Sequence, residues 1–186
     1  MTIDVDEIRT TTDRYLHRYP TERDRLTRLL AAIDGGSNLT SRKEFSGHAT
    51  CGAVLIDPDR RVLHIRHNAL ALWLLPGGHV EPEDDSLPAA ATREVHEETG
   101  IHPNGLIPLD GFDNIPFDID VHQIPASPGK DEPEHWHFDF RHAFRVAGAP
   151  TIRLQHAEVS EHRWLASNAI PSPRIRLKLR GSTGSR

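Results

Sequence analysis

Apolar residues near the start of the chain recur at helical spacing. Four of them follow a loose helical period: Val5, Ile8, Tyr15 and Tyr19. Pro20 cannot continue a helix, so the first predicted helix ends there.

The pattern that follows Pro20 predicts a second helix. Thr21 is expected to be its N-cap, and Gly35 and Gly36 are expected to end it. Its apolar residues recur at i, i+3, i+4 and i+7: Leu26, Leu29, Leu30 and Ile33. Each helix would have one apolar stripe. We therefore expect residues 1–45 to form a helical appendage, packed on the main domain or on a second copy of the chain.

From Gly47 the apolar period changes from helical to alternating. The stretch CGAVLIDPDRRVLHIRH is rich in small and β-branched residues around the turn DPDR, which predicts a β-hairpin. LWLLPGG predicts a short strand, 106–124 and 135–147 predict further strands, and EHRWLAS indicates a strand end. A basic segment from Pro173 is expected to form the last helix.

One helix is predicted inside this run of strands. Ser86 is a good N-cap for a helix that continues to Thr99, and Gly100 supplies the left-handed residue that ends it. Strands and helices do not alternate regularly. The prediction is therefore an α/β fold with a mixed sheet flanked by helices.

The strands around 118–124 and 135–141 are amphipathic. If they pair as a hairpin, the aromatic residues between the polar ones face the core, and one polar face gathers His122, His135, His137, Asp139 and Arg141. Three interpretations stay open for this face: a solvated sheet surface, the wall of a substrate pocket, or a zinc site that includes His135 and His137.

Composition restricts the class of protein. The chain has 186 residues, 37% hydrophobic and 26% charged, which suits one globular domain with an appendage. Its longest apolar run, 69–75, is too short to span a membrane, and its acidic start does not resemble a secretion signal. Cys51 is the only cysteine, so we expect a reducing cytoplasm and no internal disulfide. A net charge of −5 makes a nucleic-acid polymer an unsuitable partner.

Three glutamates lie close together in the predicted helix before Gly100. At about 100° per residue, Glu94, Glu97 and Glu98 fall on the same third of the helix as its apolar residues. They should therefore point to the interior or to a cleft, where their charges repel unless a cation holds them. Mg²⁺ prefers such oxygen ligands. A metal site and a charged face partnered by Arg93 both stay open from the residues alone.

The stretch GGHVEPEDDSLPAAATREVHEETGI resembles the Nudix box. The second half of that pattern matches in full, from Arg93 and Glu94 to Ile101. The first half, which begins at Gly78, has aspartate where the pattern has glutamate and contains one inserted residue. The acidic position of the first half can therefore fall on Asp84 or on Asp85.

The resemblance implies a fold and a reaction. The fold is the Nudix α/β/α sandwich with a mixed sheet over residues 46–180. In this chain we expect the helical appendage at 1–45, a hairpin of two helices, before this domain and a flexible tail at 181–186 after it. The reaction is metal-dependent hydrolysis of a phosphoanhydride, in a nucleoside diphosphate linked to another group or in a related small organic diphosphate. The implied cofactor is Mg²⁺ or Mn²⁺.

The resemblance also implies roles for residues of the box. Glu94, Glu97 and Glu98 are the expected metal ligands, and Arg93 is expected to position a glutamate by a salt bridge. The expected catalytic residues are Glu98, Glu97 and Arg93, with Glu98 the first candidate for the general base. Three glutamates outside the box are further candidates for that base: Glu132, Glu134 and Glu158.

The expected partner is a small-molecule diphosphate, and a homodimer stays open. The residues expected to bind substrate are Arg66, Gly77, Gly78, His79, His137 and Arg141. Two other functions stay open: a non-catalytic Nudix-fold module that senses a nucleotide, and an enzyme that resembles isopentenyl-diphosphate isomerase. The isomerase needs an active-site cysteine, and Cys51 lacks that sequence context.

Overall fold

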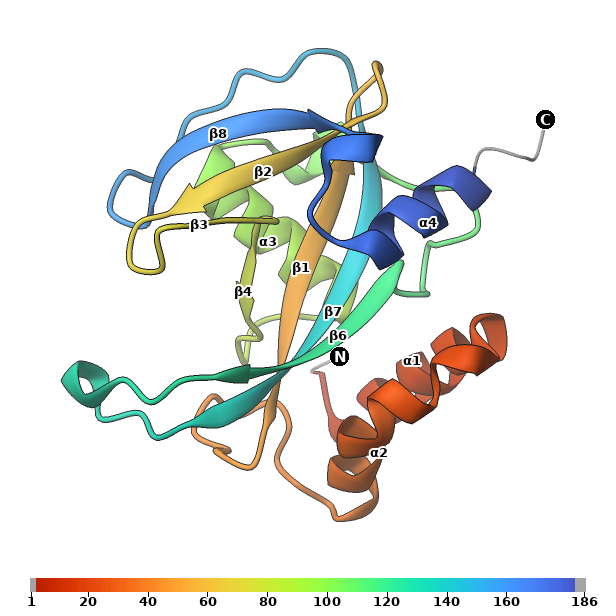
Figure 1. The fold of residues 1–186 in the computed structure, drawn as a ribbon, viewed down its shortest axis with the longest axis vertical. Coiled ribbons are helices and arrows are strands. Elements are labelled where there is room, and N and C mark those ends of the chain that lie inside the picture. The colour runs from red at the N-terminus through yellow and green to blue at the C-terminus, as the bar shows by residue number, and fades with distance from the viewer. Residues whose placement is uncertain (1–2, 183–186) are drawn as a thin grey trace.

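The computed structural model describes residues 3–182 and contains one mixed sheet with helices on both faces (Figure 1). The strands are β1 (His48–Ile56), β2 (Arg61–His67), β3 (Leu72–Leu74), β4 (Gly77–His79), β5 (Leu106–Pro108), β6 (Asp118–Ile124), β7 (His135–Val146) and β8 (Val159–Ala166). The helices are α1 (Val5–Arg18), α2 (Thr27–Asp34), α3 (Leu87–Thr99) and α4 (Pro173–Gly181). Among the described residues, no helix has the length and apolar content needed to cross a membrane.

The sheet has the order β3-β2-β1-β7-β5, with β4 also paired to β1, β6 to β7 and β8 to β2. β1 and β7 are parallel, and the other pairs are antiparallel. Because side chains alternate across a strand, β1 has two different faces. Cys51 and Ala53 pack in the cluster that includes α3, while Val54 packs in the cluster that includes α4. The sheet is therefore the middle layer of an α/β/α sandwich, as predicted.

Most of the predicted elements are confirmed at their places in the chain. The DPDR turn joins β1 to β2, and α4 begins at Pro173. Ser86 accepts a hydrogen bond from the backbone N–H of Ala89, and Gly100 ends α3 with φ of 68°. The N-terminal helices share the buried core of the sheet, where Leu29 and Ile33 lie in one cluster with Phe138. The boundary of the appendage at residue 45 stays a proposal.

Two sequence predictions are wrong in detail. Thr21 does not cap α2, because two short 3₁₀ helices, Pro20–Glu22 and Asp24–Leu26, lie between Pro20 and the start of α2 at Thr27. The predicted strand 106–124 is two strands, β5 and β6. Residues 109–117 between them turn at Gly111, whose φ of 77° suits glycine, and do not extend the ladder. Residues 183–186 of the predicted tail lie outside the described residues.

A buried aspartate ties the helices to the sheet. Asp118 in β6 has no exposed surface, and its carboxylate is 2.8 Å from Lys178 Nζ in α4 and 3.2 Å from Arg25 Nη2 before α2. Arg141 in β7 and Arg174 in α4 lie 3.4 and 3.3 Å from the same carboxylate. A buried carboxylate is favourable only while such partners compensate its charge.

We predict that Asp118→Asn lowers the free energy of unfolding by about 3 kcal/mol, because it leaves several cationic groups without their buried counter-charge. Urea denaturation measures this. The control is Asp110→Asn: Asp110 pairs with Arg145 but its side chain is 81% exposed, so its removal should cost less than about 1 kcal/mol. Equal losses in the two variants would contradict the prediction.

Candidate functional site

The three box glutamates lie on α3 beside β4. Glu98 is buried, and its Oε2 accepts a hydrogen bond from the backbone N–H of Gly77 at 2.9 Å. The carboxylate of Glu94 lies against Gly78, and its side chain is 13% exposed. Glu97 is 53% exposed and lies nearer the solvent. Glu94 and Glu98 therefore point inward, as the helical periodicity predicts. The same periodicity placed Glu97 with them, but Glu97 stands at the exposed rim.

Both glycines of β4 are required by close approach. A Cβ on Gly77 would lie 2.4 Å from the carbonyl oxygen of Cys51, so β1 leaves no room for a side chain there. A Cβ on Gly78 would lie 2.6 Å from the carboxylate atoms of Glu94. Gly77 thus allows β4 to lie close to β1, and Gly78 leaves room for the carboxylate of Glu94.

Arg93 connects the parts of the site. Its guanidinium donates to both carboxylate oxygens of Asp84 at 2.9 Å, to Glu94 at 2.9 Å, to Glu97 at 3.1 Å and to the carbonyl oxygen of His79 at 2.8 Å. These five contacts match the five N–H groups of a guanidinium. Hydrogen bonding to Asp84, against the opposing effect of burial, raises the pKa of Arg93. The geometry is that of a positioning residue.

The structure distinguishes the two aspartates that the sequence left open. Asp84 is buried, accepts the bidentate contact from Arg93 and also accepts a hydrogen bond from the backbone N–H of Glu81 at 2.8 Å. Asp85 lines a cavity between this loop and α1. Asp84 is therefore the aspartate that contacts Arg93 from the loop before α3.

Burial and mutual repulsion perturb the carboxylates. Burial raises the pKa of Glu98 to about 8, against the hydrogen bond from Gly77, and the charges of Glu94 and Glu158 raise it further. Burial raises the pKa of Glu94 to about 7, against the attraction of Arg93, and Glu97 and Glu81 add to the rise. Without a cation, Glu98 is mostly protonated at neutral pH and Glu94 is about half protonated. Carboxylates crowded in this way can hold a hard divalent cation such as Mg²⁺.

The structure thus adds two acids to the neighbourhood of the box. Glu158, one of the three glutamates named as an outside candidate, is close enough to Glu98 to raise its pKa. Its loop is held by Asn68, whose backbone N–H donates to the carbonyl oxygen of Glu158 at 2.8 Å. Glu81 is not identifiable from the sequence as a site residue, although it follows the Gly-Gly pair closely. Glu132 lies elsewhere, paired with Arg42 at 3.3 Å.

The remaining predicted substrate-binding residues lie on other surfaces. Arg66 in β2 lies 3.6 Å from Glu161 and faces the ring of Trp73. Arg141 is engaged by Asp118, Asp120 and Asp139, the last at 2.7 Å. Their contact with a substrate stays a prediction.

The pairing of β6 with β7 confirms the polar face of the hairpin. His122 lies opposite His137, Asp120 opposite Asp139 and Asp118 opposite Arg141, while Phe138 and Phe140 are buried. This face continues onto β1 through His48 and onto β4 through His79. Gly78 faces Glu94, so the ring of the next residue, His79, lies on the side of the sheet opposite α3. A direct role of this face in the glutamate site stays a prediction.

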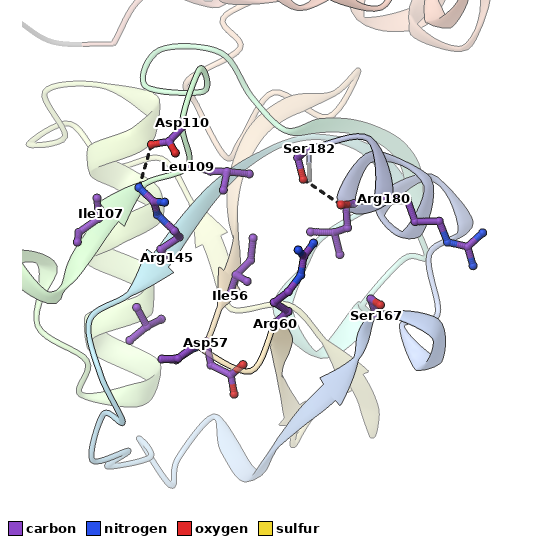
Figure 2. Close-up of a pocket in the computed structure, with 13 residues that line it drawn as sticks. Ile56, Asp57, Arg60, Ile107, Leu109, Asp110, Arg145, Ser167, Arg180 and Ser182 are labelled. Atoms are coloured by element: carbon purple, nitrogen blue, oxygen red, sulfur yellow. Dashed lines mark hydrogen bonds and ion pairs between the residues drawn. The ribbon is translucent and has the colours of Figure 1, made fainter. Parts of the chain in front are cut away.

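A separate cavity of about 700 Å³ lies at the far end of β1 (Figure 2). Ile56 and Asp57 line it together with Arg60, and Arg145 at its edge pairs with Asp110 at 2.8 Å. None of the described residues that line it belongs to the predicted site.

Comparison with known proteins agrees with the fold and the box. A profile of the NUDIX domain matches residues 46–182, so the chain belongs to the NUDIX domain family. A protein of Lactococcus lactis named "Probable DHNTP pyrophosphohydrolase" is 31% identical over 109 residues, 59% of this chain and 57% of that protein. The RNA pyrophosphohydrolase of Roseobacter denitrificans is 31% identical over 121 residues, 59% of this chain and 72% of that protein.

Solved structures share the fold at lower identity. An Ap4A hydrolase of C. elegans has a TM-score of 0.55 at 20% identity, over 73% of this chain and 94% of that one. The dihydroneopterin triphosphate pyrophosphohydrolase of E. coli has a TM-score of 0.53 at 20% identity, over 72% of this chain and 92% of that one. These likenesses confirm the Nudix-type fold.

We predict that Glu98→Gln stabilises the metal-free protein at pH 8 and has a smaller effect at pH 5. The folded-state pKa of Glu98 is about 8 and its ordinary value is 4.5, so the folded state binds more protons between these values. The free energy of unfolding therefore falls as pH rises through this window, and glutamine removes that loss. A gain of about 1 kcal/mol corresponds to a rise in Tm of about 2–4 °C.

Thermal unfolding of the EDTA-treated protein at the two pH values measures this effect. Glu161→Gln is the control, because its side chain is 62% exposed and its removal should not change the pH dependence. A Glu98→Gln variant that is destabilised equally at both pH values would refute the assignment of a raised pKa.

Proposed function

We propose that this chain is a metal-dependent hydrolase that cleaves a phosphoanhydride in a nucleoside diphosphate derivative or a related small organic diphosphate. The observation that carries the proposal is the convergence of Glu94 and Glu98 at the Gly77–Gly78 backbone, with Glu97 at the rim. The printed names of the relatives, which include a DHNTP and an RNA pyrophosphohydrolase, support the same reaction class.

The donor set fits Mg²⁺ or Mn²⁺, because three carboxylates supply oxygen ligands and, among the described residues, only Arg93 forms ion pairs with them. When bound, such an ion would neutralise phosphate oxygens and lower the pKa of a water molecule. Glu94, Glu97 and Glu98 would hold it. Arg93 would keep two of these carboxylates in place, and Asp84 would keep Arg93 in place.

Glu98 is our first candidate for the group that takes the proton from the attacking water. The hydrogen bond from Gly77 fixes its carboxylate, and a bound divalent ion would keep this carboxylate ionised and so able to accept a proton. Glu158 is the second candidate, because it is an exposed carboxylate within electrostatic reach of Glu98. The two assignments are separable by substitution.

The alternatives have less support. Cys51 is fully buried in β1, and burial raises the pKa of its thiol. It is therefore unsuited to act as the exposed active-site cysteine that an isomerase of the isopentenyl-diphosphate type would need. A sensing module would not require Arg93 and Asp84 to hold carboxylates at the rim. A homodimer and a cytoplasmic location stay predictions.

We predict that Glu97→Gln and Glu98→Gln each lower kcat by about 100-fold or more with the fold retained. The test is a substrate panel with Mg²⁺: nucleoside triphosphates, dihydroneopterin triphosphate, dinucleoside tetraphosphates, nucleotide sugars, ADP-ribose, coenzyme A and prenyl diphosphates. Phosphate or diphosphate release is measured. Failure of the wild-type protein to hydrolyse any compound that it binds would favour the sensing module, and normal turnover by Glu98→Gln but not by Glu158→Gln would move the base to Glu158.

We predict that Asp84→Asn lowers kcat by about 10-fold, because asparagine keeps the size of the side chain but loses the charge that holds Arg93. KM should change less than kcat, since Asp84 acts through Arg93 and the glutamates. Glu83→Gln, an exposed acid in the same loop, is the matched control. A change confined to KM would instead indicate contact between Asp84 and the substrate.

A further inference from the structure

Histidines from four strands meet at one end of the sheet, on the face opposite α3. His137 lies opposite His48 of β1 and His122 of β6 in the register, and His79 of β4 lies opposite Thr50 of β1. The ring centroids of His48, His135 and His137 are 4.8 to 5.1 Å apart. Those of His79 and His122 lie 5.2 and 5.6 Å from His137. The proposed function uses none of these rings.

The backbone fixes the tautomers of two rings. His135 Nδ1 is 2.8 Å from the carbonyl oxygen of Pro133, and His48 Nδ1 is 3.2 Å from the carbonyl oxygen of Glu44. A carbonyl oxygen only accepts hydrogen bonds, so in each neutral ring the proton is on Nδ1 and the lone pair is on Nε2. Metal-bound histidines commonly have this arrangement, with the second nitrogen donating to a carbonyl group.

The lone pair of His135 lies against His137, and that of His48 is buried. His48 is 1% exposed, and its Nε2 is buried without a hydrogen-bond partner among the described residues. His135 Nε2 is 3.2 Å from His137 Nε2. One proton on His137 could satisfy His135, but it would leave the acceptor on His48 uncompensated. A buried acceptor without a partner costs about 1–3 kcal/mol.

The spacing suits a tetrahedral metal. Two nitrogens at about 2.05 Å from Zn²⁺ lie about 3.3 Å apart, close to the 3.2 Å between His135 and His137. One ring nitrogen from each of His48, His135 and His137 lies within 4.8 Å of the others. Imidazole nitrogens suit Zn²⁺ and its neighbours in the transition series, whereas Mg²⁺ prefers oxygen.

We propose that His48, His135 and His137 form a binding site for a divalent transition metal of the zinc type, with three protein ligands and one open position. The site is independent of the proposed function, because the glutamates lie on the other face of the sheet. A bound ion would join the start of β1 to the start of β7. It would also fix the segments after Glu44 and before His135, whose carbonyl groups orient the rings.

The test is zinc binding by the full-length chain after removal of metals with EDTA. Zn²⁺ is titrated in competition with a chromophoric chelator, and Co²⁺ is added separately because its visible absorption reports tetrahedral coordination. The substitutions are made in a Glu94→Gln, Glu98→Gln background, so that the two inward carboxylates of the glutamate site do not contribute. His135→Ala and His137→Ala remove ligands, and His122→Ala is the matched control on the same face.

We expect one equivalent of Zn²⁺ to bind to the background protein and to the His122→Ala control. We expect the affinity to fall by at least about 100-fold in His135→Ala and in His137→Ala, with loss of the tetrahedral Co²⁺ spectrum. Zn²⁺ should also raise the Tm of the background protein by several degrees, and it should not raise the Tm of variants that lack one of the three histidine ligands. If the His135→Ala variant does not fold, the His135→Asn variant is used in its place.

Three results would overturn the proposal. The first is no Zn²⁺ binding tighter than about 10 µM in the unsubstituted protein. The second is unchanged affinity in both ligand variants. The third is zinc binding by the unsubstituted protein that disappears in the glutamine background, which would assign the ion to the carboxylates. Loss of hydrolysis in the glutamine background is expected from the proposed function and has no bearing on this site.

Discussion

The guanidinium of Arg93 is the constraint on which the glutamate site depends. Its five N–H groups are directed to Asp84, Glu94, Glu97 and the carbonyl oxygen of His79, so one side chain joins the loop before α3, the helix and β4. A lysine has three donors on a flexible stem and could not make this planar set of contacts. The places of Glu94 and Glu97 relative to β4 therefore depend on one residue, whereas Glu98 is held by the backbone N–H of Gly77. The cost is that Arg93 has no donor left for a ligand.

Burial gives these carboxylates their chemistry. Glu94 lies against Gly78 and Glu98 accepts from the backbone N–H of Gly77, and loss of water there raises the pKa of each above its ordinary value. Two nearly buried acids on adjacent helical turns are stable only when protonated or when a cation compensates them. The same burial that destabilises the empty site thus increases its preference for a divalent ion. Asp118 shows the other solution, in which arginines and a lysine supply the compensating charge permanently.

Local patterns predicted what depends on nearby residues. The period of α3 placed Glu94 and Glu98 on the buried face, and alternation placed His122 and His137 on one side of a hairpin. Long-range pairing was not predictable from such patterns. The parallel pairing of β1 with β7 brings His48 to His137, although 89 positions separate them in the sequence, and no local signal indicates it. Spacing alone also could not choose between Asp84 and Asp85, since the choice depends on which carboxylate reaches Arg93.

Because side chains alternate across a strand, two different sets of possible metal-binding groups lie on the two faces of the sheet at β4. Gly78 faces the carboxylates, and its neighbour His79 faces the imidazoles, while the carbonyl oxygen of His79 accepts from Arg93. Around β4, the carboxylates of Glu94 and Glu98 lie on the side of α3, and the imidazoles of the histidine cluster lie on the opposite side. Hard and borderline cations would therefore be separated by ligand type as well as by position. β4 is only three residues long and is paired with β1 along its whole length. A displacement of the β4 backbone at the glutamate site would therefore also displace His79 on the opposite face.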